Sequence, residues 1–169
     1  MALSTPDGDL VITGSLSANS MNYPSTSINN ADIGASAAIA ASKLVHRHAV
    51  RFSLGTSTTV SSFNENIFVA SAAGIAQSFE VSPEVSPTGG DVYKVDLQKG
   101  NSASTFVSVL SAVVSISSDT NDRTVQSGSI TTTSFADGDL YRVVSETTSA
   151  AGTMGTGLCV MLKLDENPS

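Results

Sequence analysis

The stretch from Ser82 to Ile116 constrains the fold most, because it holds two β-type runs joined by a turn. Its first run, residues 92–98, alternates apolar and polar side chains with period two, the signature of a strand with one buried face. The Gly-Asn turn at 99–101 leads into a second apolar run at 106–116. We therefore expect an antiparallel hairpin at the centre of a β-sheet.

The chain from residue 46 onward repeats this pattern and predicts roughly eight strands separated by short turns. The further expected strands are 49–54, 66–70, 74–81, 123–133 with Gly128 as a candidate break, 140–145 and 157–164. The last run is apolar almost throughout, so we expect it to be buried on both faces or to lie at the sheet centre. The tail 165–169 is polar and is expected to be exposed. This organisation predicts an all-β, jelly-roll-like antiparallel β-sandwich over residues 46–169.

Residues 1–45 differ from that body, because they are rich in Ser, Asn and Ala and show no sustained period. We expect an extended N-terminal arm with at most a short helical turn at 31–42. The arm has too little apolar area to offset the entropy of ordering its backbone, so it should order against a partner. Its apolar residues are the predicted contacts with a capsid or a sister subunit: Leu10, Val11, Ile12, Ile28, Ile33, Ile39 and Leu44.

Composition narrows the class of partner. The net charge is −7 and no basic cluster is present, which disfavours nucleic-acid binding. No apolar run approaches the ~20 residues of a membrane span, and the N-terminus does not look like a signal peptide. Charged residues make up only 14% of the chain, about half the usual ~25%. A surface rich in Ser and Thr costs little to bury against other chains, as in a subunit of an assembly.

No residues form a recognisable catalytic constellation, and we expect neither enzymatic activity nor a cofactor. Asp91 and Asp96, or Glu80 and Glu84, could be read as paired glycosidase carboxylates, but no aromatic platform for a sugar accompanies them. The lone Cys159 lies in an apolar run and is expected to be an inert core residue.

Two Asp-Gly-Asp triplets, 7–9 and 137–139, could supply carboxylates to calcium. They lack the further oxygen ligands of an EF-hand loop, so a role in turns is expected.

Five segments of the chain resemble bacteriophage virion proteins. Residues 28–48 resemble the linker that precedes small β-domains in such proteins, and residues 6–18 are similar to the repeated β-turn motifs of tail-fibre shafts. The segments 86–101 and 134–144, with the closing run 157–164, look like the jelly-roll modules of phage decoration and receptor-binding proteins. The resemblance implies a homotrimer whose N-terminal segment attaches to the particle.

The resemblance further implies a capsid decoration (cement) protein. Such a protein would bind the major capsid protein at the outer capsid surface of the virion and stabilise the assembled head. The alternative is a head-fibre or tail-tip module that recognises a host-surface glycan, with the loops 149–155 and 57–64 as contact surfaces.

His46 and His48 are a second point of resemblance. They resemble the His-x-His motif of some trimeric phage fibres, in which three copies of the motif surround an iron ion. Residues two apart in a strand point the same way, so both imidazoles could reach one metal. Two ligands per chain are too few unless symmetry supplies the rest. We therefore interpret the pair as a polar junction between arm and body and assign no metal site.

Overall fold

The computed structural model describes residues 45–167, which contain ten strands and no helix. The strands follow the short alternating runs of the sequence, and Gly, Pro, Asn or Asp stands in most of the turns between them. Their bounds are β1 His46–Ser53, β2 Phe63–Val69, β3 Gly74–Ser82, β4 Val92–Asn101, β5 Ser104–Ser108, β6 Val114–Ile116, β7 Gln126–Gly128, β8 Ser134–Phe135, β9 Leu140–Thr148 and β10 Cys159–Glu166.

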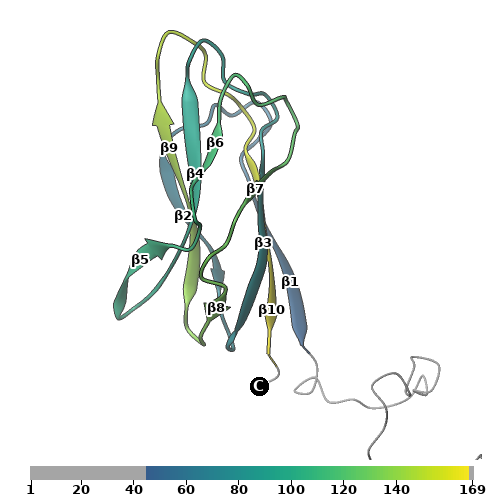
Figure 1. Ribbon diagram of the computed structural model, residues 1–169, viewed down its shortest axis with the longest axis vertical. Helices are drawn as coiled ribbons and strands as arrows, with labels where there is room; N and C mark the ends of the chain where they lie inside the picture. The colour runs from purple at the N-terminus through teal and green to yellow at the C-terminus, as the bar shows by residue number, and fades with distance from the viewer. Residues whose placement is uncertain (1–44, 168–169) are drawn as a thin grey trace, which may run out of the picture. The chain divides into compact units, whose positions relative to one another are not determined.

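Two antiparallel five-stranded sheets pack face to face (Figure 1). The β3 sheet has the order β1-β10-β3-β7, and β8 also pairs with β3. The β4 sheet has the order β2-β9-β4-β5, and β6 also pairs with β4. The pairs β1 with β10, β2 with β9, β3 with β7 and β8, and β4 with β5 and β6 are those of one long hairpin rolled into two layers. This is the jelly-roll arrangement, so the predicted fold class is confirmed.

The core lies between the sheets and is built by the inward halves of the alternating strands. Tyr93, Val95 and Leu97 of β4 are completely buried, as are Tyr141 and Val143 of β9. The two tyrosine hydroxyls have no hydrogen-bond partner among the described residues. Burial raises the pKa of Tyr141 to about 12, with a smaller contribution from the nearby carboxylate of Asp139.

The expected hairpin is present, but its turn lies at residues 102–103, because β4 continues through the turn predicted at 99–101. Two of the later runs are less regular than predicted. The second run forms two strands, β5 and β6, because Val109 and Leu110 between them both turn inward and are buried. The strand predicted at 123–133 is ladder-paired only in β7, which ends at the candidate break Gly128, and the rest of that prediction is wrong. Beyond β7, the amides of Thr131 and Thr132 bond the carbonyl of Val109 instead of continuing along β3.

Strand β10 confirms one expectation and corrects two. It lies inside the β3 sheet as predicted, but only one of its faces is buried, because nothing in the described chain covers the outer face of that sheet. Cys159 therefore points outward and is exposed, so its predicted place in the core is wrong. The tail was expected to be exposed, yet Glu166 is only 3% exposed.

Candidate functional site

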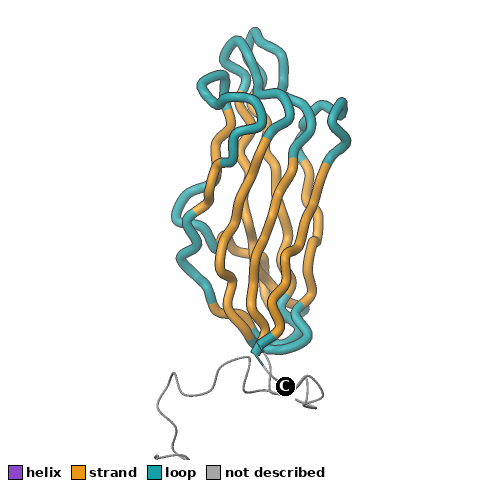
Figure 2. The backbone as a smooth tube through the Cα atoms, turned by 90° about the vertical axis from the view of Figure 1, so that its right-hand side faces the viewer, coloured by secondary structure: helices purple, strands orange, loops and turns teal. Residues whose placement is uncertain are grey.

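The connections of the sandwich divide between two ends of the body. Four loops, residues 54–62, 83–91, 117–125 and 149–158, gather at one end, which we call the loop end (Figures 1 and 2). His46 and Glu166 are paired at the opposite end, which we call the terminal end because the chain enters β1 and leaves β10 there.

The loop 149–158 connects the loops around it. Thr156 forms β-bridges to both Thr59 and Val85. The amide of Val60 donates to Gly155 O at 2.9 Å, and the amide of Thr88 donates to Thr153 O at 2.9 Å. Three loops that are distant in sequence are thereby held by backbone hydrogen bonds.

Asp91 holds the tip of the loop 149–158 in place. Its side chain is 3% exposed, and its Oδ1 accepts hydrogen bonds from the amides of Ala150 and Gly152. Gly152 is required there, because a Cβ at this position would lie 1.6 Å from Thr88 O. Asp91, which could be read as a catalytic acid, thus holds the loop in shape through Oδ1.

The loop 117–125 is fastened to the loop 83–91. The amide of Ser86 donates to Asp122 Oδ1 at 2.8 Å, and the amide of Arg123 donates to Pro83 O at 2.9 Å. The Arg123 guanidinium also bonds Glu84 through Nε at 2.9 Å and through Nη2. Its hydrogen bond holds the pKa of Glu84 below the usual range, so the pair is charged at neutral pH.

A groove of about 530 Å³ lies between these two fastened loops. This volume falls within the range of about 300–1,000 Å³ that is typical of small-molecule sites. The groove is lined by Val85, Ser86, Pro87, Thr88, Ser118, Thr120, Asn121 and Asp122. Sequence reasoning missed it, since its walls come from segments more than thirty residues apart and no motif marks either one.

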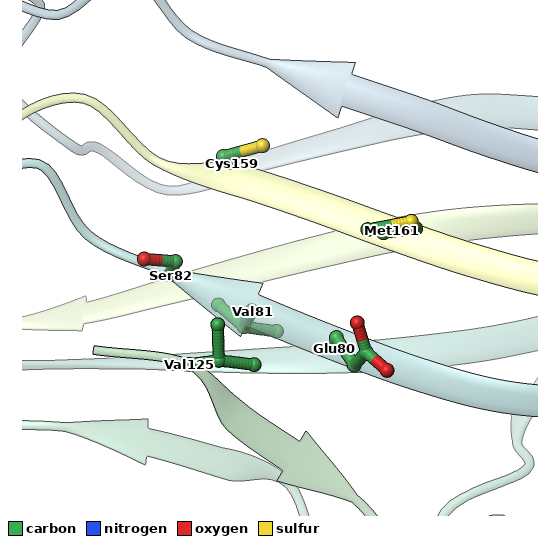
Figure 3. A pocket seen from close by; sticks show the side chains of 6 residues that line it. All are labelled: Glu80, Val81, Ser82, Val125, Cys159 and Met161. Atoms are coloured by element: carbon green, nitrogen blue, oxygen red, sulfur yellow. The ribbon is translucent and has the colours of Figure 1, made fainter. Parts of the chain in front are cut away.

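A smaller apolar hollow of about 120 Å³ lies on the outer face of the β3 sheet (Figure 3). Cys159 and Met161 of β10 and Glu80 of β3 border it, and Val125 comes from the chain just before β7. It is well below the size of an ordinary ligand site and has almost no polar lining. We assign it no ligand.

At the terminal end, His48 contacts a buried carboxylate rather than forming a metal centre. Its Nε2 lies 3.0 Å from Glu166 Oε2. Glu166 also accepts hydrogen bonds from the amide of Ser71 at 2.7 Å and the amide of Ala72 at 3.3 Å. Burial alone would raise the pKa of Glu166, but these donors and His48 outweigh it and lower that pKa. Among residues 45–167, no group of three or more His, Cys, Asp or Glu side chains could hold a metal.

The remaining acidic candidates have local partners as well. Asp139 is 6% exposed and accepts hydrogen bonds from the Ala136 amide at 2.9 Å and from Asn101 Nδ2 at 3.1 Å, so the turn predicted at 137–139 is confirmed. Asp96 accepts hydrogen bonds from Ser108 Oγ at 2.6 Å and Gln98 Nε2 at 2.9 Å.

The predicted capsid contacts lie outside the described residues: Leu10, Val11, Ile12, Ile28, Ile33, Ile39 and Leu44. The same holds for the triplet at 7–9 and for the helical turn predicted at 31–42. The two loops predicted as glycan contacts, 149–155 and 57–64, do lie at the loop end, but backbone hydrogen bonds hold parts of both.

Comparisons with known proteins leave the function open. No protein-family model matches the chain, and neither a search of curated proteins nor a search of solved structures finds a match. Within the part of the chain that the structure describes, no helix is long and apolar enough to cross a membrane.

Proposed function

We propose that the chain is a bacteriophage capsid decoration protein, located on the outer surface of the virion. Its N-terminal segment, residues 1–44, binds the major capsid protein, and its sandwich body stands on that attachment as part of a homotrimer. The observation that carries the proposal is a difference between the two ends of the body: the first strand begins at one end, and hydrogen-bonded loops gather at the other. The chain enters at the terminal end, whereas the loop end is closed by its own hydrogen bonds. Such a body suits a module attached through its entering segment.

The mechanism of stabilisation is mass action. A protein that binds only the assembled shell stabilises it by RT ln(1 + [L]/Kd), which opposes loss of capsid subunits. The low share of charged residues, 14%, supports burial of the surface against other chains. The phage resemblance of residues 28–48 and of the three body segments supports the choice of a virion as the assembly.

Deletion of residues 1–44 tests the attachment. We expect the full chain to co-sediment with empty phage heads and the shortened chain to stay in the supernatant. Circular dichroism of the shortened chain controls for folding. Binding of the shortened chain with unchanged affinity would assign attachment to the body instead, and failure of the full chain to bind any head would contradict the proposal. Light scattering tests the trimer, for which the expected mass is three times 17.2 kDa.

A further inference from the structure

We propose that the groove between residues 85–88 and 118–122 is a binding site for a neutral sugar, as a free monosaccharide or as one unit of a surface polysaccharide. This site is at the loop end and does not depend on capsid attachment. It also differs from the loops that the sequence predicted as glycan contacts, 149–155 and 57–64.

The first argument is the set of polar groups that the fold leaves unused on the groove wall. Asp122 is exposed; its Oδ1 accepts the hydrogen bond from Ser86, while Oδ2 accepts none from the described residues. The side chains of Asn121 and Ser118 are also exposed and make no hydrogen bond within residues 45–167. A carboxylate oxygen, an amide and a hydroxyl can together accept from and donate to the neighbouring hydroxyl groups of one sugar ring.

The second argument is that hydrogen bonds within the protein hold the groove in shape before a ligand binds. Both walls are fixed by the Ser86–Asp122 and Pro83–Arg123 bonds and by the Glu84–Arg123 ion pair. The turn 117–120 is closed by the Ser117 amide bonding Thr120 Oγ1 at 3.3 Å and by the Thr120 amide bonding Ser117 O at 3.0 Å. A pre-formed site spends little binding free energy on ordering its own loops.

The third argument is chemical class. Val85 is 43% exposed beside the groove and offers an apolar contact to the C–H face of a sugar ring. No Lys or Arg lines the groove, and Asp122 gives it negative charge, so anionic ligands such as phosphates and sialic acid are disfavoured. Because no aromatic ring lines it either, stacking is absent and affinity for a single site should be weak, in the millimolar range. Many copies on one particle would compensate by multivalency.

Saturation-transfer difference NMR on the full chain tests the proposal, with glucose, galactose, mannose and N-acetylglucosamine as probes and sialic acid as the anionic comparison. We expect saturable transfer to at least one neutral sugar at millimolar concentration and none to sialic acid. A polysaccharide built from the responding sugar should compete with it; a polysaccharide that binds while every monosaccharide fails would require a longer site than the groove.

Two variants locate the binding. Asp122→Asn keeps an oxygen for the Ser86 amide while removing the carboxylate charge, and Asn121→Ala removes a side-chain amide that makes no hydrogen bond to the other described residues. Each should weaken binding about tenfold or more, the loss expected for about 1.4 kcal/mol from one hydrogen bond. The matched control is Asp119→Asn, in the same turn but not lining the groove, which should bind as the wild type does. Absence of transfer to all neutral sugars, or transfer that survives both groove variants, would overturn the proposal.

Discussion

Glu166 is the residue on which the terminal end depends most. It is 3% exposed, yet it is ionised beside two backbone amides, the Ser71 hydroxyl and His48. A buried carboxylate is tolerated only where its hydrogen bonds replace those of water. The donors come from the β2–β3 connection, and the carboxylate comes from the last position of β10. The contact therefore ties the end of β10 to the connection that joins the two sheets.

We predict that Glu166→Gln lowers the free energy of unfolding at pH 7 by about 1–3 kcal/mol, because the substituted amide turns an N–H₂ group toward donors that need an acceptor. Denaturant unfolding measures the change. The matched control is Asp165→Asn, whose partner Arg47 is 81% exposed and whose ion pair should be worth no more than about 1 kcal/mol. Equal effects of the two substitutions would contradict a special role for Glu166.

The same residue gives the stability a pH dependence with a defined sign. The pKa of Glu166 is lower in the folded protein than its ordinary value of 4.5, so the unfolded chain takes up the proton first as the pH falls. The stabilisation from Glu166 is complete above about pH 4.5 and is lost as the pH falls through the folded pKa. The difference between wild type and Glu166→Gln should therefore shrink below that pH. A difference that stays constant down to acid unfolding would exclude this linkage.

The residues of this network could not be predicted from the sequence. Asp165 and Glu166 stand in a polar tail, and nothing local distinguishes the carboxylate that is buried from the one that is not. The difference comes from the register of β10, which turns Glu166 inward beside the Ser71 and Ala72 amides. In the same way, residues 159–162 are all apolar, so the sequence did not indicate which of them would face the core.

Among the elements, the loop 149–158 has the most restricted geometry. Gly152 and Gly89 meet there with almost no space between the two backbones, since a Cβ on Gly89 would lie 2.5 Å from the Gly152 Cα. Gly89 also has a φ of 61°, which favours glycine. Close approach of backbones, rather than side-chain packing, is what joins these loops.

We predict that Gly152→Ala destabilises the protein by about 1–3 kcal/mol, because the methyl group collides with a backbone carbonyl that cannot rotate away. Gly55→Ala is the control in a neighbouring loop, where the new methyl group would meet only the Thr58 hydroxyl at 3.1 Å, and should change stability by no more than about 0.5 kcal/mol. Hydrogen exchange should show faster opening at the Thr88 and Thr153 amides in the first variant alone. Unchanged protection there would mean that the loop absorbs the methyl group without separating.

Element prediction from the sequence succeeded where a strand has regular alternation and a clear turn. The turn before β9 was predicted because Gly138 stands in an Asp-Gly-Asp sequence just before the alternating run 140–145. The β4–β5 hairpin was predicted because Gly100 follows the alternating run 92–98, although its turn falls at 102–103. Prediction failed at β7, where the Thr-rich run 123–133 suits a strand but lacks a continuous partner. Strand propensity describes a side chain's fit to a sheet surface and does not say whether the neighbouring strand extends that far.

At the scale of the whole molecule, the sheet order could not be predicted from the sequence, because the pairings other than β4 with β5 join segments whose partner no local pattern identifies. The order nevertheless has a clear consequence for where the chain can be cut. Strand β1 covers β10 along its full length, from His46 opposite Glu166 to Ser53 opposite Cys159. The core residues between the sheets all follow residue 49.

We therefore predict opposite results for two truncations. A chain that begins at Val45 keeps every described strand and should unfold in one cooperative transition with a midpoint close to that of the full chain. A chain that begins at Leu54 loses β1, leaves the β10 amides and carbonyls that face β1 without a partner, and removes the contacts of Val50 and Phe52 with the core. It should aggregate or unfold without cooperativity, as circular dichroism and light scattering would show. If the chain that begins at Val45 also lost cooperative folding, residues 1–44 would be part of the folding unit. Failure of that shortened chain to bind phage heads could then no longer be ascribed to a missing attachment segment.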